Sequence, residues 1–257
     1  MADANPFDRL ARYYDWEHDE YDADIPLYRD FARRTGGPIL ELACGTGRLM
    51  VPLLEEGERV VGVDSSRPML DRARQTLGRA GLAGRATLQQ ADVRTLDLGE
   101  RFRLAVFGLD SFGLLLTIGD QLAALRRIRQ HLEPGGLLVL DLSNGNGRGD
   151  EPPDELLLQR SGRDPETGHP LSKWTARATD HAEQIDRYTY FYDEVLDDGT
   201  LHRSTTSLVL RYFGRFELEL LLDVAGFAPE VFYGTYDLAP FSMHGDRLIA
   251  VAARADA

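Results

Sequence analysis

Two carboxylates and a loop of small residues carry the most specific chemistry in the sequence. Glu41 lies in a short apolar run, 38–42, and a turn of small residues, 43–47, follows it. A turn of this kind between a strand and a helix lets a ligand approach the backbone closely. Asp64 ends the next apolar run, 59–63, and lies 23 residues after Glu41 (64 − 41 = 23). In a parallel α/β sheet, an acidic residue at this position accepts hydrogen bonds from ribose hydroxyls.

The spacing of the glycines separates two ligands that contain a ribose. A nicotinamide dinucleotide site has the pattern G-x-G-x-x-G, whose third glycine lets the helix pack closely on the strand. Here Gly45 and Gly47 are followed by Met50 at the position of the third glycine. A helix start that binds pyrophosphate would gain from a third glycine, which this loop lacks. An adenosyl-sulfonium ligand carries no phosphate and has less need of that glycine. The loop therefore favours S-adenosylmethionine over NAD.

Four segments of the chain resemble motifs of the class I S-adenosylmethionine-dependent methyltransferases, in the order in which that family carries them. They are 41–47 (ELACGTG), 62–66 (GVDSS) with the Met-Leu pair at 69–70, 90–93 (QADV) and 132–140 (LEPGGLLVL). The resemblance implies in-line transfer of a methyl group to a nitrogen or oxygen of a small-molecule acceptor. Its plan is similar to sugar and amine N-methyltransferases that carry an antiparallel cap.

The resemblance also implies which residues bind S-adenosylmethionine. Glu41 and the loop backbone would hold its methionine part, and Asp64 would accept from its ribose. Asp92 would accept a hydrogen bond from the adenine amino group. Leu109, at the end of a fourth strand, would lie beside the transferable methyl. The cofactor-binding set is Tyr14, Glu41, Ala43, Gly45, Gly47, Asp64, Ser65, Met69, Asp92, Val93 and Leu109.

Three side chains are candidates for a catalytic role: Asp110 after the fourth strand, Tyr14 in the N-terminal segment, and His244 in a loop between the last two strands. Transfer from a sulfonium mainly requires alignment and exclusion of water, and an amine acceptor must also lose its proton. Related sequences often read Ser-Phe-x-His-Leu after the fourth strand, but this chain has Leu114 at the histidine position. The chain therefore relies on alignment alone or on another group.

Composition bounds the partners. The chain has 257 residues and a formal net charge of −13, which argues against nucleic-acid binding, because such binding normally relies on a basic surface. No apolar run has the length of a membrane span, and the N-terminus shows no signal-peptide pattern. The single cysteine, Cys44, fits a reducing compartment, and scattered histidines predict no metal site. We expect a cytoplasmic protein with a small-molecule acceptor, and the sequence leaves room for a homodimer.

Alternating strand and helix patterns predict an α/β fold, and the resemblance specifies a doubly wound, mostly parallel seven-stranded sheet of the Rossmann-like methyltransferase type. Residues 1–36 are expected to form an N-terminal lid segment. Residues 37–143 and 214–257 are expected to form the cofactor-binding core. The β-rich stretch within 144–213, with a hairpin signal at 197–199, predicts three antiparallel strands in a cap insertion.

Two rival interpretations stay open at this point. A non-catalytic S-adenosylmethionine-binding protein would carry the same motifs without turnover. An NAD-dependent oxidoreductase would share the first loop, but Met50 and the segments 90–93 and 132–140 speak against it. The residues do not specify the acceptor, or whether nitrogen or oxygen is methylated.

Overall fold

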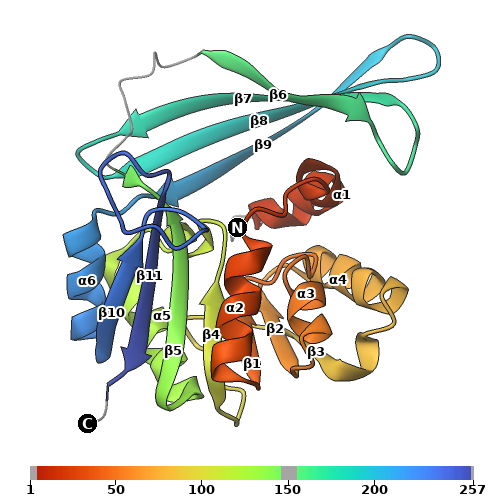
Figure 1. Ribbon diagram of the computed structural model, residues 1–257. Helices are drawn as coiled ribbons and strands as arrows, with labels where there is room; N and C mark the ends of the chain where they lie inside the picture. The colour runs from red at the N-terminus through yellow and green to blue at the C-terminus, as the bar shows by residue number, and fades with distance from the viewer. Residues whose placement is uncertain (1–4, 146–154, 256–257) are drawn as a thin grey trace.

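The computed structural model describes residues 5–145 and 155–255, which form two sheets (Figure 1). The larger sheet has seven strands in the order β10-β11-β5-β4-β1-β2-β3. β11 pairs antiparallel with both neighbours, and the other pairings are parallel. This is the predicted doubly wound sheet. Its strands are β1 (Ile39–Leu42), β2 (Val60–Asp64), β3 (Ala86–Gln90), β4 (Phe102–Phe107), β5 (Leu132–Ser143), β10 (Phe227–Tyr233) and β11 (Arg247–Arg254).

Helices cover both faces of this sheet because its central strands are apolar on both sides. Along β4, Leu104 and Val106 join one buried cluster, whereas Ala105 and Phe107 join the other. The first cluster packs under α2 (Ile25–Thr35), α3 (Met50–Glu55) and α4 (Arg67–Arg79). The second packs under α5 (Ile118–His131) and α6 (Arg215–Val224). Two short 3₁₀ helices complete this part, η1 (Ala83–Arg85) and η2 (Ser111–Leu114).

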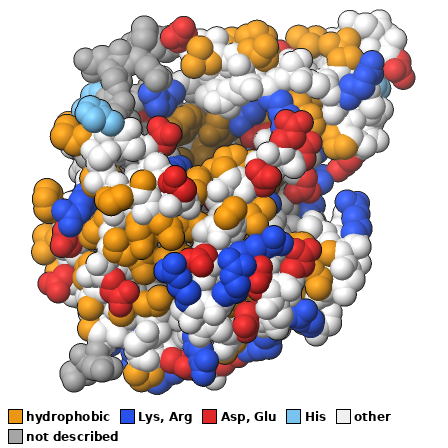
Figure 2. Space-filling view, in the orientation of Figure 1, with side chains coloured by type: hydrophobic (Ala, Val, Ile, Leu, Met, Phe, Trp, Pro, Cys, Tyr) orange, Lys and Arg blue, Asp and Glu red, His pale blue; other side chains and the backbone are white. Residues whose placement is uncertain are grey.

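The smaller sheet, called the cap sheet here, has four antiparallel strands in the order β6-β7-β8-β9. They are β6 (Leu156–Arg163), β7 (Pro170–Asp180), β8 (Ile185–Val195) and β9 (Leu201–Arg211). The prediction of three strands was wrong, because β6 was not recognised. β6 is exposed along nearly its whole length, so its sequence lacks the alternation of a half-buried strand. Figure 2 shows the molecule hollowed beneath this sheet.

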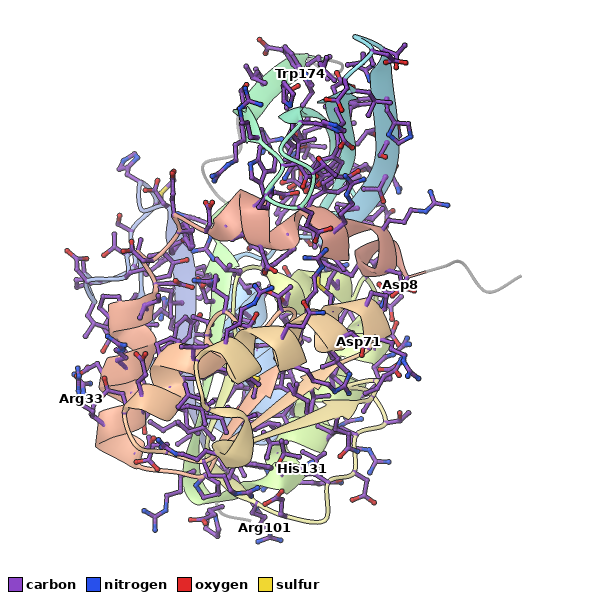
Figure 3. The ribbon with its side chains drawn as sticks, turned by 90° about the vertical axis from the view of Figure 1, so that its right-hand side faces the viewer. Asp8, Arg33, Asp71, Arg101, His131 and Trp174 are labelled. Atoms are coloured by element: carbon purple, nitrogen blue, oxygen red, sulfur yellow. The ribbon has the colours of Figure 1, made fainter. Side chains whose placement is uncertain are left out.

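Helix α1 (Pro6–His18) lies between the cap sheet and the core (Figure 3). Its buried side chains contact Met69 of α4 below and Leu171 and Tyr192 of the cap sheet above. The rings of Tyr13 and Tyr192 stack with centroids 3.9 Å apart. Burial on two sides therefore fixes α1 over the carboxyl ends of the strands, and Tyr13 serves packing.

Within residues 5–145 and 155–255, every helix is too short or too polar to cross a membrane. The same residues contain no group of three His, Cys, Asp or Glu side chains placed to hold a metal ion.

Candidate active site

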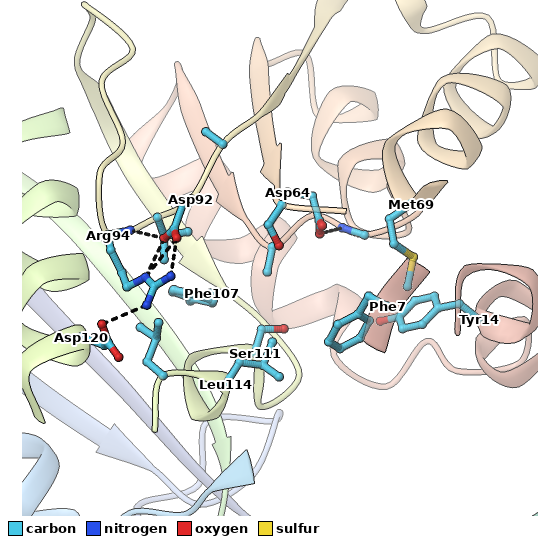
Figure 4. A pocket seen from close by; sticks show the side chains of 16 residues that line it. Phe7, Tyr14, Asp64, Met69, Asp92, Arg94, Phe107, Ser111, Leu114 and Asp120 are labelled. Carbon is cyan, nitrogen blue, oxygen red and sulfur yellow. Dashed lines mark hydrogen bonds and ion pairs between the residues drawn. The ribbon is translucent and has the colours of Figure 1, made fainter. Parts of the chain in front are cut away.

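A cavity of about 220 Å³, called the main cavity, lies at the carboxyl ends of the core strands (Figure 4). Ligands of open α/β sheets bind at this edge. The cavity is closed on one side by α1, which contributes Phe7 and Tyr14. Its lining is Phe7, Tyr14, Ala43, Gly45, Asp64, Ser65, Met69, Ala91, Asp92, Val93, Arg94, Phe107, Ser111, Leu114, Leu115 and Asp120.

Asp64 holds the glycine loop in place. One carboxylate oxygen accepts a hydrogen bond from the backbone N–H of Gly45 at 2.9 Å, and the other accepts from the N–H of Ser66 at 2.7 Å. The loop bends through left-handed conformations at Ala43 (φ 51°) and Gly45 (φ 55°). Each carboxylate oxygen keeps a lone pair, so Asp64 can still accept from a ribose.

Met50 stands where a dinucleotide loop has its third glycine, and Gly62 on strand β2 provides the space that this larger side chain needs. Gly62 of β2 faces the start of α3, and a Cβ added there would lie 2.6 Å from the Met50 sulfur and 2.9 Å from the Cys44 sulfur. The side chain of Met50 thus occupies space that Gly62 leaves free. A glycine on the strand allows the close helix–strand approach that dinucleotide sites obtain from a glycine on the helix. Cys44 is buried there as a small packing residue.

A second, narrow cavity of about 20 Å³, called the loop cavity, extends from the main cavity beneath the loop. Glu41 lines it, and its buried Oε2 atom has no hydrogen-bond partner in the described parts of the chain. Burial raises the pKa of the Glu41 carboxyl to about 8, and the Arg48 charge opposes this shift. An unpartnered buried carboxylate oxygen fits the ammonium group of a methionine moiety. The lining is Tyr14, Glu41, Leu42, Ala43, Cys44, Arg48, Leu49, Gly108, Leu109 and Ser111.

At the other end of the main cavity, Asp92 is already paired. Arg94 donates to its carboxylate from Nη2 at 2.6 Å and also bonds Asp120 from Nη1 at 3.0 Å. These hydrogen bonds from Arg94 hold the pKa of Asp92 below its usual range. The carboxylate is therefore fixed in position and charged, which suits an acceptor for an adenine amino group. Arg94 and Asp120 were not expected from the sequence.

A third cavity, the cap cavity, of about 720 Å³, opens between α1 and the cap sheet. Leu109 lines both the cap cavity and the loop cavity, so the end of β4 is where the two meet. Sequence reasoning did not find the cap cavity, because α1, the loop that follows it, β6 and β7 supply all of its lining except Leu109. Its lining is Glu17, His18, Glu20, Tyr21, Leu109, Gln159, Arg160, Ser161 and Lys173.

Comparisons with known proteins agree with this geometry. A family model described as a methyltransferase domain matches residues 39–136. The chain is 27% identical to the cypemycin N-terminal methyltransferase of a Streptomyces species, in a match covering 85% of this chain and 84% of that enzyme. It is 26% identical to the glycopeptide N-methyltransferase MtfA, solved with S-adenosylmethionine, with a TM-score of 0.56 over 90% of this chain and 94% of that one. The match at 39–136 is to a methyltransferase domain, and the chain is an S-adenosylmethionine-dependent methyltransferase.

Two further proteins are similar to this methyltransferase. The dTDP-3-amino-3,4,6-trideoxy-alpha-D-glucopyranose N,N-dimethyltransferase of Streptomyces venezuelae is 33% identical, over 55% of this chain and 58% of that enzyme. The CcbJ methyltransferase from Streptomyces caelestis superposes with a TM-score of 0.84 at 23% identity, over 100% of both chains, and this shows the shared fold. This superposition therefore includes both the seven-stranded sheet and the cap sheet.

The predicted cofactor residues of the methyltransferase come together at the main and loop cavities. Of the set named from the sequence, all but Gly47 line one of these two cavities. Gly47 lies below them, where a Cβ would meet Ala73 of α4 at 3.4 Å, and its φ of 81° favours glycine. Arg48, Phe7 and Leu114 also line the two cavities and were missed. Their sequence signal was weak, since each could equally belong to a helix surface or a core.

The catalytic candidates separate clearly. Tyr14 lines the main and loop cavities, and burial raises the pKa of its phenol, which stays protonated. The Asp110 carboxylate instead accepts hydrogen bonds from the N–H and hydroxyl of Ser143 and lines none of the three cavities. His244 is exposed on its loop and lines none of them either. As a correction, we do not retain Asp110 or His244 as catalytic candidates.

Asp110 belongs to a buried network that fixes the turn after β4. Both Leu109 (φ 45°) and Asp110 (φ 60°) are left-handed there. Asp141, fully buried on β5, accepts from the Leu109 N–H at 3.2 Å and from Nε of Arg247 at 2.8 Å. The Tyr28 hydroxyl donates to the same carboxylate at 3.2 Å. Because strain of this kind persists only where the surroundings enforce it, the network positions Leu109 at the junction of the loop and cap cavities.

Proposed function

We propose that this methyltransferase transfers a methyl group to an amine nitrogen of a small polar molecule bound in the cap cavity. The observation that carries the proposal is the position of Leu109, which joins the loop cavity to the cap cavity. A methionine part bound beside Glu41 would direct its sulfonium methyl past this residue. The relatives named above favour nitrogen as the methylated atom, because one acts at an N-terminus and another is an amino-sugar N,N-dimethyltransferase.

The residues of the chain would hold the two reactants in line. The backbone at Ala43 and Gly45 and the carboxylate of Glu41 would bind the methionine part, with Asp64 on the ribose and Asp92 on the adenine. S-adenosylmethionine supplies an electrophilic methyl group on a positively charged sulfur. Helix α1 and the cap sheet close over the strand ends and exclude water from the reacting atoms. Alignment of this kind supplies much of the acceleration of a two-reactant step.

The lining of the cap cavity supports a polar acceptor. It carries two acidic side chains, Glu17 and Glu20, and two basic ones, Arg160 and Lys173. Lys173 is paired with Glu17, and Arg160 donates to Asp19 at 2.7 Å. A cavity of about 720 Å³ is in the range that small-molecule ligands occupy. Mixed charges suit an acceptor with hydroxyl groups as well as an amine, such as an amino sugar or a peptide N-terminus.

Binding and turnover test the proposal in two steps. Calorimetric titration with S-adenosylhomocysteine should show micromolar affinity, and titration with NAD under the same conditions should show none. Turnover is then assayed by mass spectrometry with S-adenosylmethionine and three amines: 3-amino-3-deoxyglucose, glucosamine and glycylglycine. Methylation at nitrogen supports the proposal. Cofactor binding with methylation only at oxygen, or with none on a wider panel of amines, overturns it.

Two coarser expectations accompany the proposed function. We propose that the protein acts in a reducing cytoplasm, which would keep the buried thiol of Cys44 free. Light scattering on the purified protein would measure whether it forms the homodimer that the sequence leaves room for.

A further inference from the structure

His18 is the imidazole that lines the cap cavity. Its Nδ1 atom lies 2.9 Å from the backbone carbonyl oxygen of Tyr14. A carbonyl oxygen only accepts, so Nδ1 must donate, and in the neutral ring the lone pair then belongs to Nε2. Among the described residues, Nε2 has no hydrogen-bond partner. The atom is also not fully buried, so it is accessible from the cavity. The ring therefore presents an available proton acceptor at the cavity.

The position of the His18 ring places its proton-accepting Nε2 atom next to a residue of the cofactor site. The imidazole stacks on the ring of Tyr14 with centroids 4.2 Å apart. Tyr14 itself lines both the main and the loop cavity, and Leu109 lines the loop and cap cavities. His18 thus stands on the acceptor side of a residue that lines the cofactor site. His18 and Leu109 both line the cap cavity, so an amine bound there would share this cavity with the ring.

The surroundings of His18 favour its neutral form. Burial lowers the pKa of the imidazole, while the Tyr14 carbonyl and the Glu17 charge oppose that shift. The charges of Arg48 and Lys173 lower it further. The other titratable or charged groups lining the cavity are Glu20, Tyr21 and Arg160. At neutral pH the ring is therefore able to take a proton.

We propose that His18 is the general base of the methyl transfer, an inference that rests on the proposed N-methylation. The acceptor enters as an ammonium, and one N–H proton passes to Nε2 of His18. The freed lone pair on nitrogen forms the new N–C bond while the C–S bond breaks and its electron pair stays on sulfur. The methylated product leaves as an ammonium, and the imidazolium loses its proton to water in the cap cavity.

The variant His18→Asn separates the base from the packing role. The side-chain amide of asparagine sits close to the position of Nδ1 and can still donate to the Tyr14 carbonyl, but nothing replaces Nε2. The matched control is His244→Asn, at an exposed histidine outside all three cavities. Affinity for S-adenosylhomocysteine should change by less than about threefold in both variants.

The measurement is kcat/KM against pH from 6 to 10, with the best amine from the panel above. His18→Asn should lose about 100-fold near pH 7, in the range of general-base effects, and the loss should shrink as pH approaches the pKa of the free amine. A similar rate to wild type at pH 7, or a loss that is equal at every pH, overturns the role of His18. If wild type binds cofactor but methylates no amine, the proposed function fails instead.

The tautomer can be measured without any acceptor. Nitrogen-15 NMR of histidine-labelled protein with S-adenosylhomocysteine should show His18 with its proton on Nδ1 and a bare Nε2 at pH 7. The His18→Asn spectrum assigns the signal. A proton on Nε2 at that pH removes the basis of the inference.

Discussion

Replacing Asp64 by alanine tests the cofactor site most directly. Asp64 lines the main cavity and is 8% exposed, and its carboxylate accepts from the N–H groups of Gly45 and Ser66. The free lone pairs are where we expect the two ribose hydroxyls. Asp110, on the turn after β4, offers a matched control, because its carboxylate is held by Ser143 and lines none of the three cavities.

The expected loss follows from the bonds removed. A hydrogen bond to a charged group contributes about 1.5–3 kcal/mol, so two ribose hydroxyls that lose a carboxylate cost roughly 3 kcal/mol. At about 1.4 kcal/mol for each tenfold change, the Kd for S-adenosylhomocysteine should rise by about 100-fold. Release of the Gly45 N–H loosens the loop and adds to this loss. Asp110→Ala should raise the same Kd by less than about tenfold, because it only relaxes the turn.

Calorimetric titration of wild type and the two variants measures these changes, with thermal unfolding of each as the check on folding. Asp64→Asn is a third variant, since its amide oxygen can keep one loop hydrogen bond, and an intermediate affinity is expected. Equal losses in Asp64→Ala and Asp110→Ala would show that the ribose site lies elsewhere. The same conclusion follows if a folded Asp64→Ala protein keeps wild-type affinity.

Three further predictions follow from the geometry. Gly62→Ala should lower the free energy of unfolding by about 1–3 kcal/mol, because its Cβ would meet Met50 at 2.6 Å. Denaturant titration measures this change. The control variant Gly84→Ala, at a site open to solvent, should change the free energy of unfolding by less than about 1 kcal/mol. The raised pKa of Glu41, about 8, means that this carboxyl is protonated at pH 7 until the cofactor ammonium lowers it. S-adenosylhomocysteine titrated at pH 7 in buffers of different ionisation enthalpy should then release about one proton from wild type and none from Glu41→Gln. Asp141→Asn should unfold at lower temperature than wild type by circular dichroism, because it weakens a buried ion pair with Arg247.

The cofactor half of the enzyme was predictable because it is local in sequence. Glu41, the loop after it and Asp64 lie within 24 residues, counting both ends, and each lies in, follows or ends a strand whose apolar run is easily recognised. Parallel topology then brings the strand ends to one edge of the sheet. The order of the motifs was therefore enough to predict the fold and half of the residues that line the main cavity.

The errors fall where contacts between distant segments decide the outcome. Asp110 follows β4 as expected, but the left-handed backbone there and the N–H of Ser143, 33 residues later, take its carboxylate out of the cavities. His244 lies in a loop that stays exposed. β6 was missed because an exposed edge strand shows no hydrophobic alternation. None of these outcomes has a signal within a short window of sequence.

The cap cavity, where we expect the methyl acceptor, depends most strongly on contacts between distant segments. Lys173 of β7 meets Glu17 of α1 across 156 residues, and Arg160 of β6 reaches Asp19 across 141. The cap cavity is thus assembled from segments that no motif connects, whereas the cofactor site comes from residues 41–120 together with Phe7 and Tyr14 of α1. One consequence is that the acceptor can change through β6 and β7 without disturbing the residues that line the main and loop cavities. His18 lies where these two parts meet: its ring stacks on a residue of the cofactor site while its free nitrogen serves the acceptor. Proton removal is therefore expected to depend on how the cap holds its substrate, and the pH profile of His18→Asn tests that dependence.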